Sequence, residues 1–511
     1  MKIERTKNAS RNIAFGIILK IYQIILPFVM RTIMIYLMGI EYAGLNNLFS
    51  SIFQILNLAE LGVGAALTYS MYKPIAEDDT SKICALLKLY KICFEIIGII
   101  ILGLGLICVP FLPYLINGSI PDNLNLYVLY LLYLTNTVLS YWLFSYKKSL
   151  IYAHQRIDIN CKIMIITYTI QYIGQIIILF VLKNYYLYLL MSIISQILNN
   201  ILAVYIVNKI YFNYIPKGDL EKEILDEIVS KVQGLITNKI GSVILRSADT
   251  IVISMFLGLT TLAIYQNYYF ILVSVASIFS MIFEACLAGI GNSLIVEKKE
   301  KNYSDFKTMT FIISWLIAIC CCCFVTLYQP FIALWVGKNH LMDYPLVICM
   351  VVYFFVYEVD ALLSTYKDAA GIWYSDRYRP LITAIINLIM NVILVQVIGL
   401  YGILLSTIVS LIFIGIPWLL HNVFNFLFKG ESIIKYVLYL LKFAVLTYIS
   451  SYITILITNF VNGNIIIVLF IRGIFAIIIP NIVMFPFFYK SSEFKRIEKI
   501  LKNLIGRKNN S

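Results

Sequence analysis

Apolar runs of twenty or more residues recur along nearly the whole of this 511-residue chain. Each run is long enough to cross the hydrocarbon core of a bilayer as a helix, which takes about twenty residues. The alternation of apolar and polar residues typical of membrane β-barrel strands is absent from the sequence, so the spans are predicted to be helices. With 61% hydrophobic and 13% charged residues, the chain has more apolar surface than a water-soluble core can bury. We therefore predict an all-α polytopic membrane protein.

Fourteen transmembrane spans are predicted, with ends good to about two to four residues. They cover residues 13–38, 43–68, 89–112, 124–146, 161–182, 187–210, 235–257, 262–290, 309–334, 345–366, 381–398, 401–427, 434–458 and 464–488. Basic residues gather in the loops after even-numbered spans and in the tail, for example Lys73, Lys82, Lys147, Lys148, Arg156, Lys217, Lys222, Lys298, Lys299, Lys301, Arg377, Arg379, Lys429, Lys495, Arg496, Lys499 and Lys502. The other loops contain only Lys183 and Lys338. The positive-inside rule therefore predicts that both termini are cytoplasmic, and the basic start of the chain predicts no cleaved signal peptide.

A charged loop at residues 212–234 divides the predicted spans into two groups. We expect an N-terminal six-helix bundle (1–211), a cytoplasmic linker (212–234), a C-terminal six-helix bundle (235–428), two extra helices (429–490) and a basic cytoplasmic tail (491–511). Shifting the sequence by 219 residues places Lys20 on Lys239 and Gly39 on Gly258. The two bundles would then have the same orientation and be related by a pseudo-two-fold axis along the membrane normal.

Two of the predicted spans carry a stripe of polar residues on one helix face. The stripes are Lys20, Gln23, Pro27 and Arg31 in the first span, and Lys239, Ser242, Arg246 and Asp249 in the seventh. A charge at mid-bilayer costs at least about 2.5–3.5 kcal/mol, so both stripes are expected to face protein or water. We predict that they line a central cavity with Arg31, Arg246, Lys239 and Lys20 as its cations. Pro27 is predicted to kink the first helix.

Carboxylates in and beside the spans are candidates for ion coupling or charge pairing. They are Asp249, Glu60, Glu284, Glu358 and Asp360. Two alternatives for the cations stay open. Arg246 and Asp249 lie one turn apart and would neutralise each other, and Lys20 would extend to the cytoplasmic interface.

The cysteines predict packing rather than metal binding. All ten lie in or beside apolar segments, and the four consecutive ones, Cys320 to Cys323, point in four directions on a helix, which excludes a tetrahedral metal site. No catalytic residue, metal or bound cofactor is predicted, whereas coupling to H⁺, Na⁺ or the membrane potential is left open. The net charge of +13 is attributed to loop anchors, so no nucleic-acid partner is expected.

Three segments resemble a known family. These are LAELGVGAALTYSMYKPIAEDD (58–79), LIYAHQRID (150–158) and ILRSADTIVISMFLGLTTLAIYQNYYFI (244–271). They are similar to segments of bacterial polysaccharide transporters, the Wzx-type lipid-linked oligosaccharide flippases. These transporters belong to the multidrug/oligosaccharidyl-lipid/polysaccharide exporter superfamily, together with multidrug antiporters and the peptidoglycan-precursor flippase.

The resemblance implies two six-helix bundles that alternate access to a central cavity in a bacterial cytoplasmic membrane. The implied cargo is a polyprenyl-diphosphate-linked oligosaccharide for capsule, O-antigen, exopolysaccharide or teichoic-type polymers, with Arg31 and Arg246 as the cavity cations. Other expected partners are membrane lipids and the polymerase and glycosyltransferases of the same pathway. One alternative is a cation-coupled multidrug antiporter, but the first span lacks the acidic residue expected there. The other is a membrane polysaccharide polymerase, which the short outer loops and scattered carboxylates disfavour.

Overall fold

The computed structural model describes the backbone of residues 5–60, 62–118 and 120–508. Within these ranges, the side chains of residues 5–10, 230–231, 233–238, 246, 500–501 and 503–508 are outside the description. Every regular element of the described backbone is helical, in agreement with the predicted all-α class. The chain divides into two compact units, unit 1 (Met1–Ala263) and unit 2 (Ile264–Ser511), which are treated separately below.

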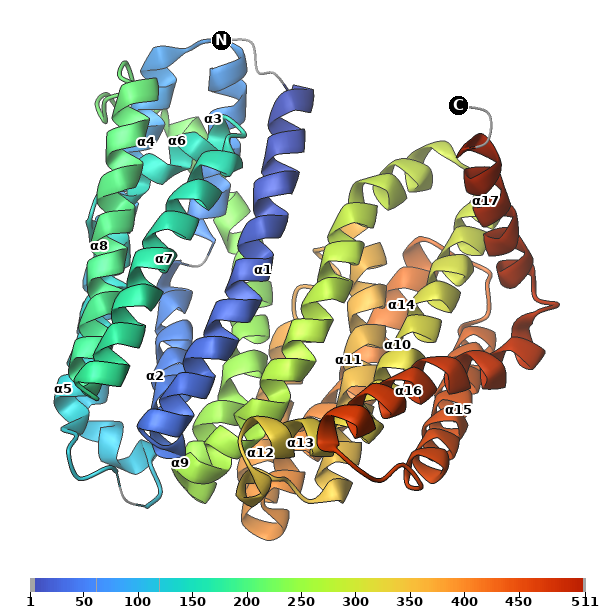
Figure 1. Ribbon diagram of the computed structural model, residues 1–511. Coiled ribbons are helices and arrows are strands. Elements are labelled where there is room, and N and C mark those ends of the chain that lie inside the picture. The colour runs from blue at the N-terminus through green and yellow to red at the C-terminus, as the bar shows by residue number, and fades with distance from the viewer. Residues whose placement is uncertain (1–4, 61, 119, 509–511) are drawn as a thin grey trace. The chain divides into compact units, whose positions relative to one another are not determined.

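Unit 1 is built from long helices joined by short turns (Figure 1). They are α1 (Arg5–Leu37), α2 (Ile40–Leu56), η1 (Asn57–Glu60), α3 (Val63–Ala76), α4 (Thr80–Cys108), η2 (Val109–Leu115), α5 (Leu126–Trp142), η3 (Ser145–Lys147), α6 (Lys148–Ala153), α7 (Ile157–Val181), α8 (Tyr185–Ile210) and the first arm of α9 (Lys222–Val296). Helix α7 packs against α1 and α8, and α5 packs against α4 and α8. Asn125 and Asn184 cap the starts of α5 and α8, since their side chains accept hydrogen bonds from Tyr127 N and Leu187 N.

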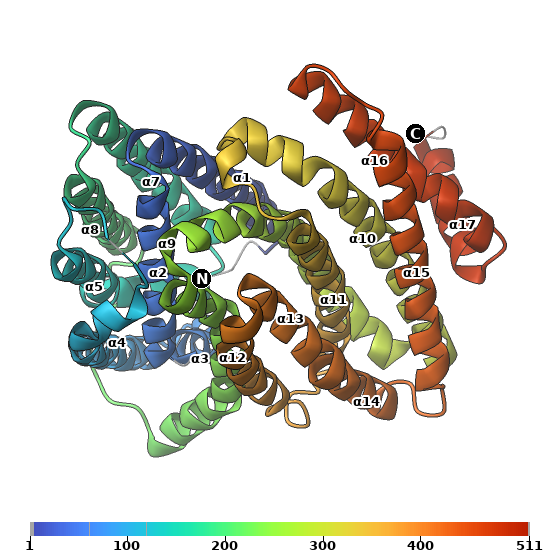
Figure 2. The same cartoon turned by 90° about the horizontal axis from the view of Figure 1, so that it is seen from below.

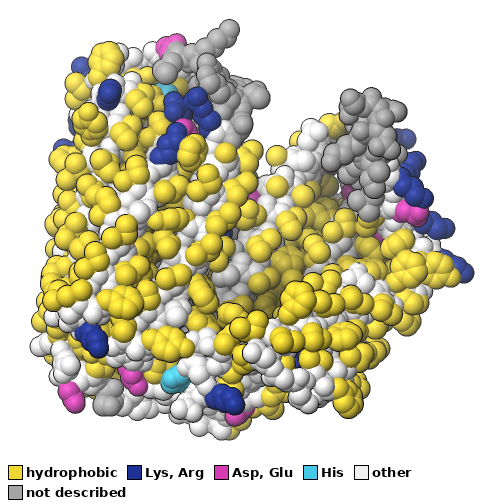
Figure 3. All heavy atoms as spheres, viewed as in Figure 1, with side chains coloured by type: hydrophobic (Ala, Val, Ile, Leu, Met, Phe, Trp, Pro, Cys, Tyr) yellow, Lys and Arg dark blue, Asp and Glu magenta, His cyan; other side chains and the backbone are white. Residues whose placement is uncertain are grey.

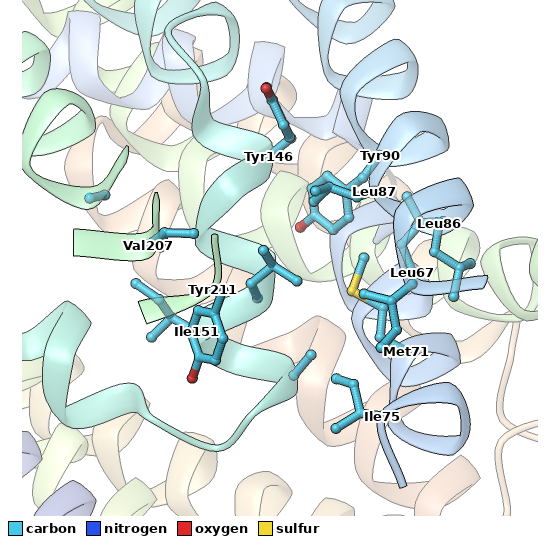
Figure 4. Close-up of a cluster of buried hydrophobic side chains, with 14 of the residues drawn as sticks. Leu67, Met71, Ile75, Leu86, Leu87, Tyr90, Tyr146, Ile151, Val207 and Tyr211 are labelled. Carbon is cyan, nitrogen blue, oxygen red and sulfur yellow. The ribbon is translucent and has the colours of Figure 1, made fainter. Parts of the chain in front are cut away.

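An apolar cluster holds together one end of unit 1 (Figure 4). It is made of large side chains from α3, α4, η3, α6 and α8, among them Leu67, Met71, Leu87, Tyr146, Ile151 and Val207. The cluster fixes the short helices η3 and α6 against α3 and α8, where the chain turns back between two long helices. Truncating one of these fully buried leucines would cost about 2–5 kcal/mol through the lost contacts and the cavity left behind.

The outer faces of the unit 1 helices are apolar. In Figure 3, hydrophobic side chains cover most of the visible sides of α1, α7 and α8, and charged side chains gather toward the ends of these helices. Helix α7 presents Ile166, Ile170, Ile173 and Ile177 at helical spacing, and each is 43% exposed or more. A band of exposed isoleucines is the surface that a lipid-facing helix needs.

The predicted second and fourth spans are bent in the structure. Helices α2 and α3 meet at an angle of 43°, because η1 and the left-handed Gly62 (φ 80°) interrupt the helix inside the predicted span 43–68. Helix α5 ends at Trp142, short of the predicted residue 146, and Phe144 with φ 54° starts a bend of 48° into η3 and α6. The predicted spans 43–68 and 124–146 are therefore each broken by a bend in the structure. Hydropathy does not locate either break, because it carries no information on backbone angles such as those of Gly62 and Phe144.

Helix α9 is a helical hairpin with its turn at one glycine. The backbone of Gly258 has φ 83° and ψ 174°, a conformation that is essentially restricted to glycine. A Cβ atom at this position would also lie 2.7 Å from the carbonyl oxygen of Asn117. The break falls between the predicted spans 235–257 and 262–290. It separates a first arm in unit 1 from a second arm that continues into unit 2.

The turn at Gly258 has a counterpart at Gly39, the residue that the 219-residue shift aligns with it. Gly39 has φ 115° and separates α1 from α2. The two turns touch within unit 1, where Thr260 Oγ1 donates a hydrogen bond to Glu41 Oε1 at 3.4 Å across a separation of 219 residues. The α2 backbone comes so close to the second turn that a Cβ atom on Gly44 would lie 2.5 Å from the carbonyl oxygen of Leu259. Residues that the shift makes equivalent are therefore neighbours in space.

Unit 2 continues with the second arm of α9 and eight further α-helices among its described residues (Figure 2). They are α10 (Lys299–Trp335), η4 (Lys338–His340), α11 (Tyr344–Ala369), α12 (Arg379–Ile398), α13 (Leu400–Ser410), the π-helix η5 (Leu411–Gly415), α14 (Ile416–Phe426), α15 (Ile433–Thr458), α16 (Ile465–Phe488) and α17 (Ser492–Lys508). Helix α10 packs against α11, α15 and α16. It begins at Lys299, 219 residues after the start of α4 at Thr80, so the same shift recurs in the helix boundaries.

The number of membrane spans is eleven to thirteen in the described residues. Eleven helices are long and apolar enough, and each bent pair adds one if it is counted as a single span. The predicted number was fourteen. The difference from the upper value lies in α9, where residues 239–296 count as one helix although two spans were predicted there.

Candidate functional site

Arg31 lies on α1 and is partly buried within unit 1. Its Nη1 donates to the Asn47 side-chain oxygen at 3.4 Å, and its Nη2 donates to the carbonyl oxygen of Ala263 at 3.1 Å. These bonds place the guanidinium at the junction of α1, α2 and the residues that follow the Gly258 turn. Helix α1 runs through Pro27 without interruption.

The first arm of α9 brings Lys239 of the second predicted stripe to η1, whereas Ser242 of the same stripe is exposed. Lys239 Nζ lies 3.5 Å from Glu60 Oε2, and Ser247 Oγ donates to the Gln54 side-chain oxygen at 3.2 Å. Asp249 is 9% exposed. The side chain of Arg246 lies outside the described residues, so its predicted pairing with Asp249 stays a prediction.

Glu60 and Lys239, predicted as separate groups, therefore form an ion pair. Both side chains are about one-third exposed, 28% and 35%, so water screens the pair and its contribution to stability is about 0–1 kcal/mol. Such a pair can open at low cost when a stronger anion approaches the lysine. Lys20 is partly buried on α1, about three helical turns before Arg31.

A cluster of tyrosine and asparagine side chains that was not predicted joins α2, α5 and α8. Tyr133 on α5 donates to the Asn46 side-chain oxygen at 2.5 Å and lies 3.1 Å from the hydroxyl of Tyr185 on α8. Asn46 precedes Asn47, the partner of Arg31, and the Tyr133 ring stacks on Phe53 with centroids 6.2 Å apart. The signal was the pair of asparagines inside an apolar helix. Amide and hydroxyl groups next to an arginine suit a polar, anionic ligand.

The remaining candidate carboxylates lie in unit 2 and have different surroundings. Glu284 is exposed on the second arm of α9. Glu358 on α11 is 1% exposed, and its Oε1 atom has no hydrogen-bond partner among the described atoms. Asp360 lies two residues after Glu358 on α11, and its Oδ1 atom is 3.5 Å from Arg379 Nη1. The structure therefore does not bring these three carboxylates together in one site.

Asp360 belongs to a buried charge network that was not predicted. Arg379 donates through Nε to Asp376 Oδ1 at 2.8 Å, and Lys367 Nζ lies 3.4 Å from Asp376 Oδ2 and 2.6 Å from Asp368 Oδ1. Lys367, Asp376 and Arg379 are 6% exposed or less. Arg379 was predicted to lie in a cytoplasmic loop, and it begins α12 in the structure. Its pairing depends on how the loop between α11 and α12 folds back, which the sequence does not show. The network ties this loop to both helices.

Metal ligands do not cluster in the described residues, where no group of three or more His, Cys, Asp or Glu side chains could hold a metal ion. The ten cysteines are free thiols. Cys321 and Cys322 are buried in the packing of α10, and the Cys322 thiol lies 3.6 Å from the Ser451 hydroxyl on α15.

Comparison with known proteins supplies the family. Residues 9–288 match the model of a family described as polysaccharide biosynthesis protein. A search of curated protein sequences gives no match. Among solved structures, lipid II flippase MurJ in an inward closed conformation matches with a TM-score of 0.65 at 17% identity, over 93% of this chain and 99% of that one.

Two further solved structures show the same fold. A multidrug resistance MATE family transporter of the MOP superfamily, in an inward-facing conformation, matches with a TM-score of 0.65 at 13% identity over 81% of this chain and 99% of that one. A MOP superfamily transporter from Pyrococcus furiosus matches with a TM-score of 0.54 at 13% identity, over 82% and 96%. With more than half of its length matched, the chain belongs to the polysaccharide biosynthesis protein family, and it has a MurJ- and MATE-like fold.

Proposed function

We propose that the protein is a flippase that moves polyprenyl-diphosphate-linked oligosaccharide units from the cytoplasmic to the outer leaflet by alternating access. The units would serve capsule, O-antigen, exopolysaccharide or teichoic-type polymer assembly. The family match and the fold shared with lipid II flippase MurJ support a lipid-linked cargo. The protein would act in a bacterial cytoplasmic membrane with both termini in the cytoplasm.

The observation that carries the proposal is the charge of α1. The helix contains five basic residues and no acidic residue, and Arg31 lies within its membrane-spanning part. An arginine there is a functional candidate, since a charge in a span is expensive. A diphosphate is a strong match for a guanidinium, because two parallel N–H donors meet two phosphate oxygens.

The site residues take distinct roles in this proposal. Arg31 and Arg246 bind the diphosphate. Lys239 leaves its ion pair with Glu60 and binds the head group when the cargo arrives. Lys20 adds positive charge along the α1 stripe. The amides and hydroxyls of the cluster around Tyr133 would bind sugar hydroxyls, which need several donors and acceptors in a site closed to water. Pro27 would give α1 the bend that alternating access requires.

The proposed architecture has fourteen membrane spans, more than the eleven to thirteen candidate spans of the described residues. Counting the two arms of α9 as separate spans adds one to thirteen and gives fourteen, so two six-helix bundles (1–211 and 235–428) would be joined by a linker (212–234). The recurring shift of 219 residues and the contact between Glu41 and Thr260 support a pseudo-two-fold relation between them. Helices α15 and α16 would be the additional pair (429–490).

The energy for transport would come from the membrane potential or from an ion. Moving one negative charge outward is favoured by about 2.3 kcal/mol per 100 mV when the inside is negative. Asp249, Glu358 and Asp360 are the buried or partly buried candidates for coupling to H⁺ or Na⁺. Glu284 is exposed, and Glu60 is paired.

The test is made in cells that depend on this protein for surface polysaccharide. Arg31→Ala and Arg246→Ala are each expected to stop export and to leave lipid-linked oligosaccharide in the inner leaflet. Arg472→Ala is the matched control, because Arg472 is also a partly buried arginine in a span and donates to a backbone carbonyl, that of Val461 at 3.5 Å. Normal polysaccharide in both site variants would reject the binding role. Drug sensitivity of a deletion strain with normal polysaccharide would favour the multidrug antiporter.

A further inference from the structure

Helix α17 is fastened to α10 by charged contacts. Lys307 Nζ lies 3.0 Å from Glu493 Oε1, and Arg496 donates to Ser304 Oγ at 3.0 Å and pairs with Asp305. Burial raises the pKa of Glu493, but bonds from its own amide, Lys307 and Ser492 outweigh burial and lower the pKa below its ordinary value. Both of these ion pairs join α17 to the same end of α10.

The apolar residues of α17 also face the protein. Phe494 and Ile497 pack on a buried cluster that includes Phe311, Met484 and Phe488. The Phe494 ring lies edge-on to Phe485, with centroids 5.6 Å apart. An amphipathic helix at a membrane surface usually buries its apolar face in lipid. In this protein α10 and α16 cover that face, so the apolar side of the described part of α17 is not available to the bilayer.

Another face of α17 is basic and exposed. Lys495, Lys499 and Lys502 lie at spacings of four and three residues on one side of the helix, about 80° to 160° around the axis from Phe494 and Ile497 at 100° per residue. Each is exposed, and Lys502 is 2.6 Å from Glu498 Oε1, also on the surface. Figure 3 shows Lys and Arg side chains along the outer edge of α17.

This basic face lies close to a membrane boundary. The spanning helix α16 ends at Phe488, and α17 begins at Ser492, with the exposed Lys490 between them. Phe485, Phe487 and Tyr489 are 42% to 56% exposed at that end of α16. Aromatic residues gather at the level of the lipid headgroups. The lysines of α17 therefore follow directly on an interfacial segment, within reach of the headgroup charges.

We propose that Lys495, Lys499 and Lys502, with Lys490, bind the headgroups of anionic phospholipids of the same membrane. The ion pairs to α10 hold the helix so that these lysines point outward and stay together. Lipid binding would in turn hold α17 against unit 2. This contact does not depend on which cargo the protein carries.

The size of the effect follows from the number of lysines. One basic residue near an anionic surface contributes about 1 kcal/mol to the binding free energy, which raises the association constant about fivefold. Removing three charges, one of them shared with Glu498, should therefore weaken the association by roughly 25- to 100-fold. Salt at about 1 M shortens the Debye length to about 3 Å and should weaken it as well.

The experiment uses the full-length protein in a neutral detergent and measures its thermal unfolding midpoint during titration with phosphatidylglycerol or phosphatidylcholine. Phosphatidylglycerol is expected to stabilise the wild type more strongly. The triple variant Lys495→Gln, Lys499→Gln, Lys502→Gln should need at least tenfold more phosphatidylglycerol for half of the effect.

Two controls make the result specific. The exposed Lys209 near the end of α8, Lys217 in the loop that follows and Lys222 at the start of α9 are replaced by Gln together, and this variant should respond as the wild type does. A variant with arginine at the three α17 positions should also keep the response, which separates charge from folding. An unchanged phosphatidylglycerol titration in the glutamine variant would overturn the proposal. If that variant nevertheless lost export in cells, an acidic protein would be the partner instead.

Discussion

Replacing Gly258 by alanine tests the hairpin turn of α9. The residue has φ 83° and ψ 174°, and an alanine in such a region is strained by about 1–3 kcal/mol. The new Cβ atom would lie 2.7 Å from the Asn117 carbonyl oxygen, and overpacking of this kind costs about another 1–3 kcal/mol. Gly258→Ala should therefore destabilise the protein by about 2–6 kcal/mol.

The assay heats purified protein in detergent and follows the fraction that stays monodisperse on size exclusion. Gly103→Ala is the control, because Gly103 is helical within α4 and has no atom within 4 Å of the new Cβ position. That variant should stay within about 1 kcal/mol of the wild type. If Gly258→Ala were as stable as Gly103→Ala, the positive φ of Gly258 and its close approach to the Asn117 carbonyl oxygen would be refuted.

Three further predictions concern single contacts. Glu60→Gln frees Lys239 from its ion pair and should raise the affinity for a soluble polyprenyl-diphosphate analogue in calorimetry, with stability changed by less than about 1 kcal/mol; weaker binding would contradict the exchange of Glu60 for cargo. Tyr133→Phe removes a hydroxyl shared with two polar side chains and should lower stability by about 1–3 kcal/mol in thermal unfolding; an unchanged midpoint would deny the network. Because the pKa of Glu493 is lowered in the folded state, its contribution to the docking of α17 is complete above a pH of about 4.3 and is lost as the pH falls through the lowered value. Spin-label distances between α10 and α17 should therefore be constant from pH 7 to about pH 5 and broaden in stronger acid, whereas Glu493→Gln should show no such acid step.

The sequence was sufficient to predict the all-helical class and most of the spans, because long apolar runs leave a local signal. The 219-residue shift aligned Gly39 with Gly258, and the structure shows that both have a positive φ at a turn. A charged residue inside an apolar run is also a local signal, and Arg31 was selected as a candidate in this way.

Pairings between distant residues could not be predicted. Lys239 meets Glu60 only because the chain bends at Gly62 and α9 returns beside it, and hydropathy reports neither event. The network of Lys367, Asp376 and Arg379 depends in the same way on a folded loop whose residues look like an ordinary cytoplasmic connection. Such contacts are set by tertiary packing, which a single sequence does not encode locally.

The central claim is that Arg31 binds the diphosphate of a lipid-linked sugar during transport. It is tested most directly in proteoliposomes with a fluorescent, short-chain polyprenyl-diphosphate-linked sugar, whose flipping is measured by quenching in the outer leaflet. Loss of a charge-assisted hydrogen bond costs about 1.5–3 kcal/mol, so Arg31→Ala should slow flipping by roughly 10- to 150-fold, and Arg31→Lys should keep part of the rate. Flipping by Arg31→Ala at the rate of the wild type and of Arg472→Ala would contradict the claim.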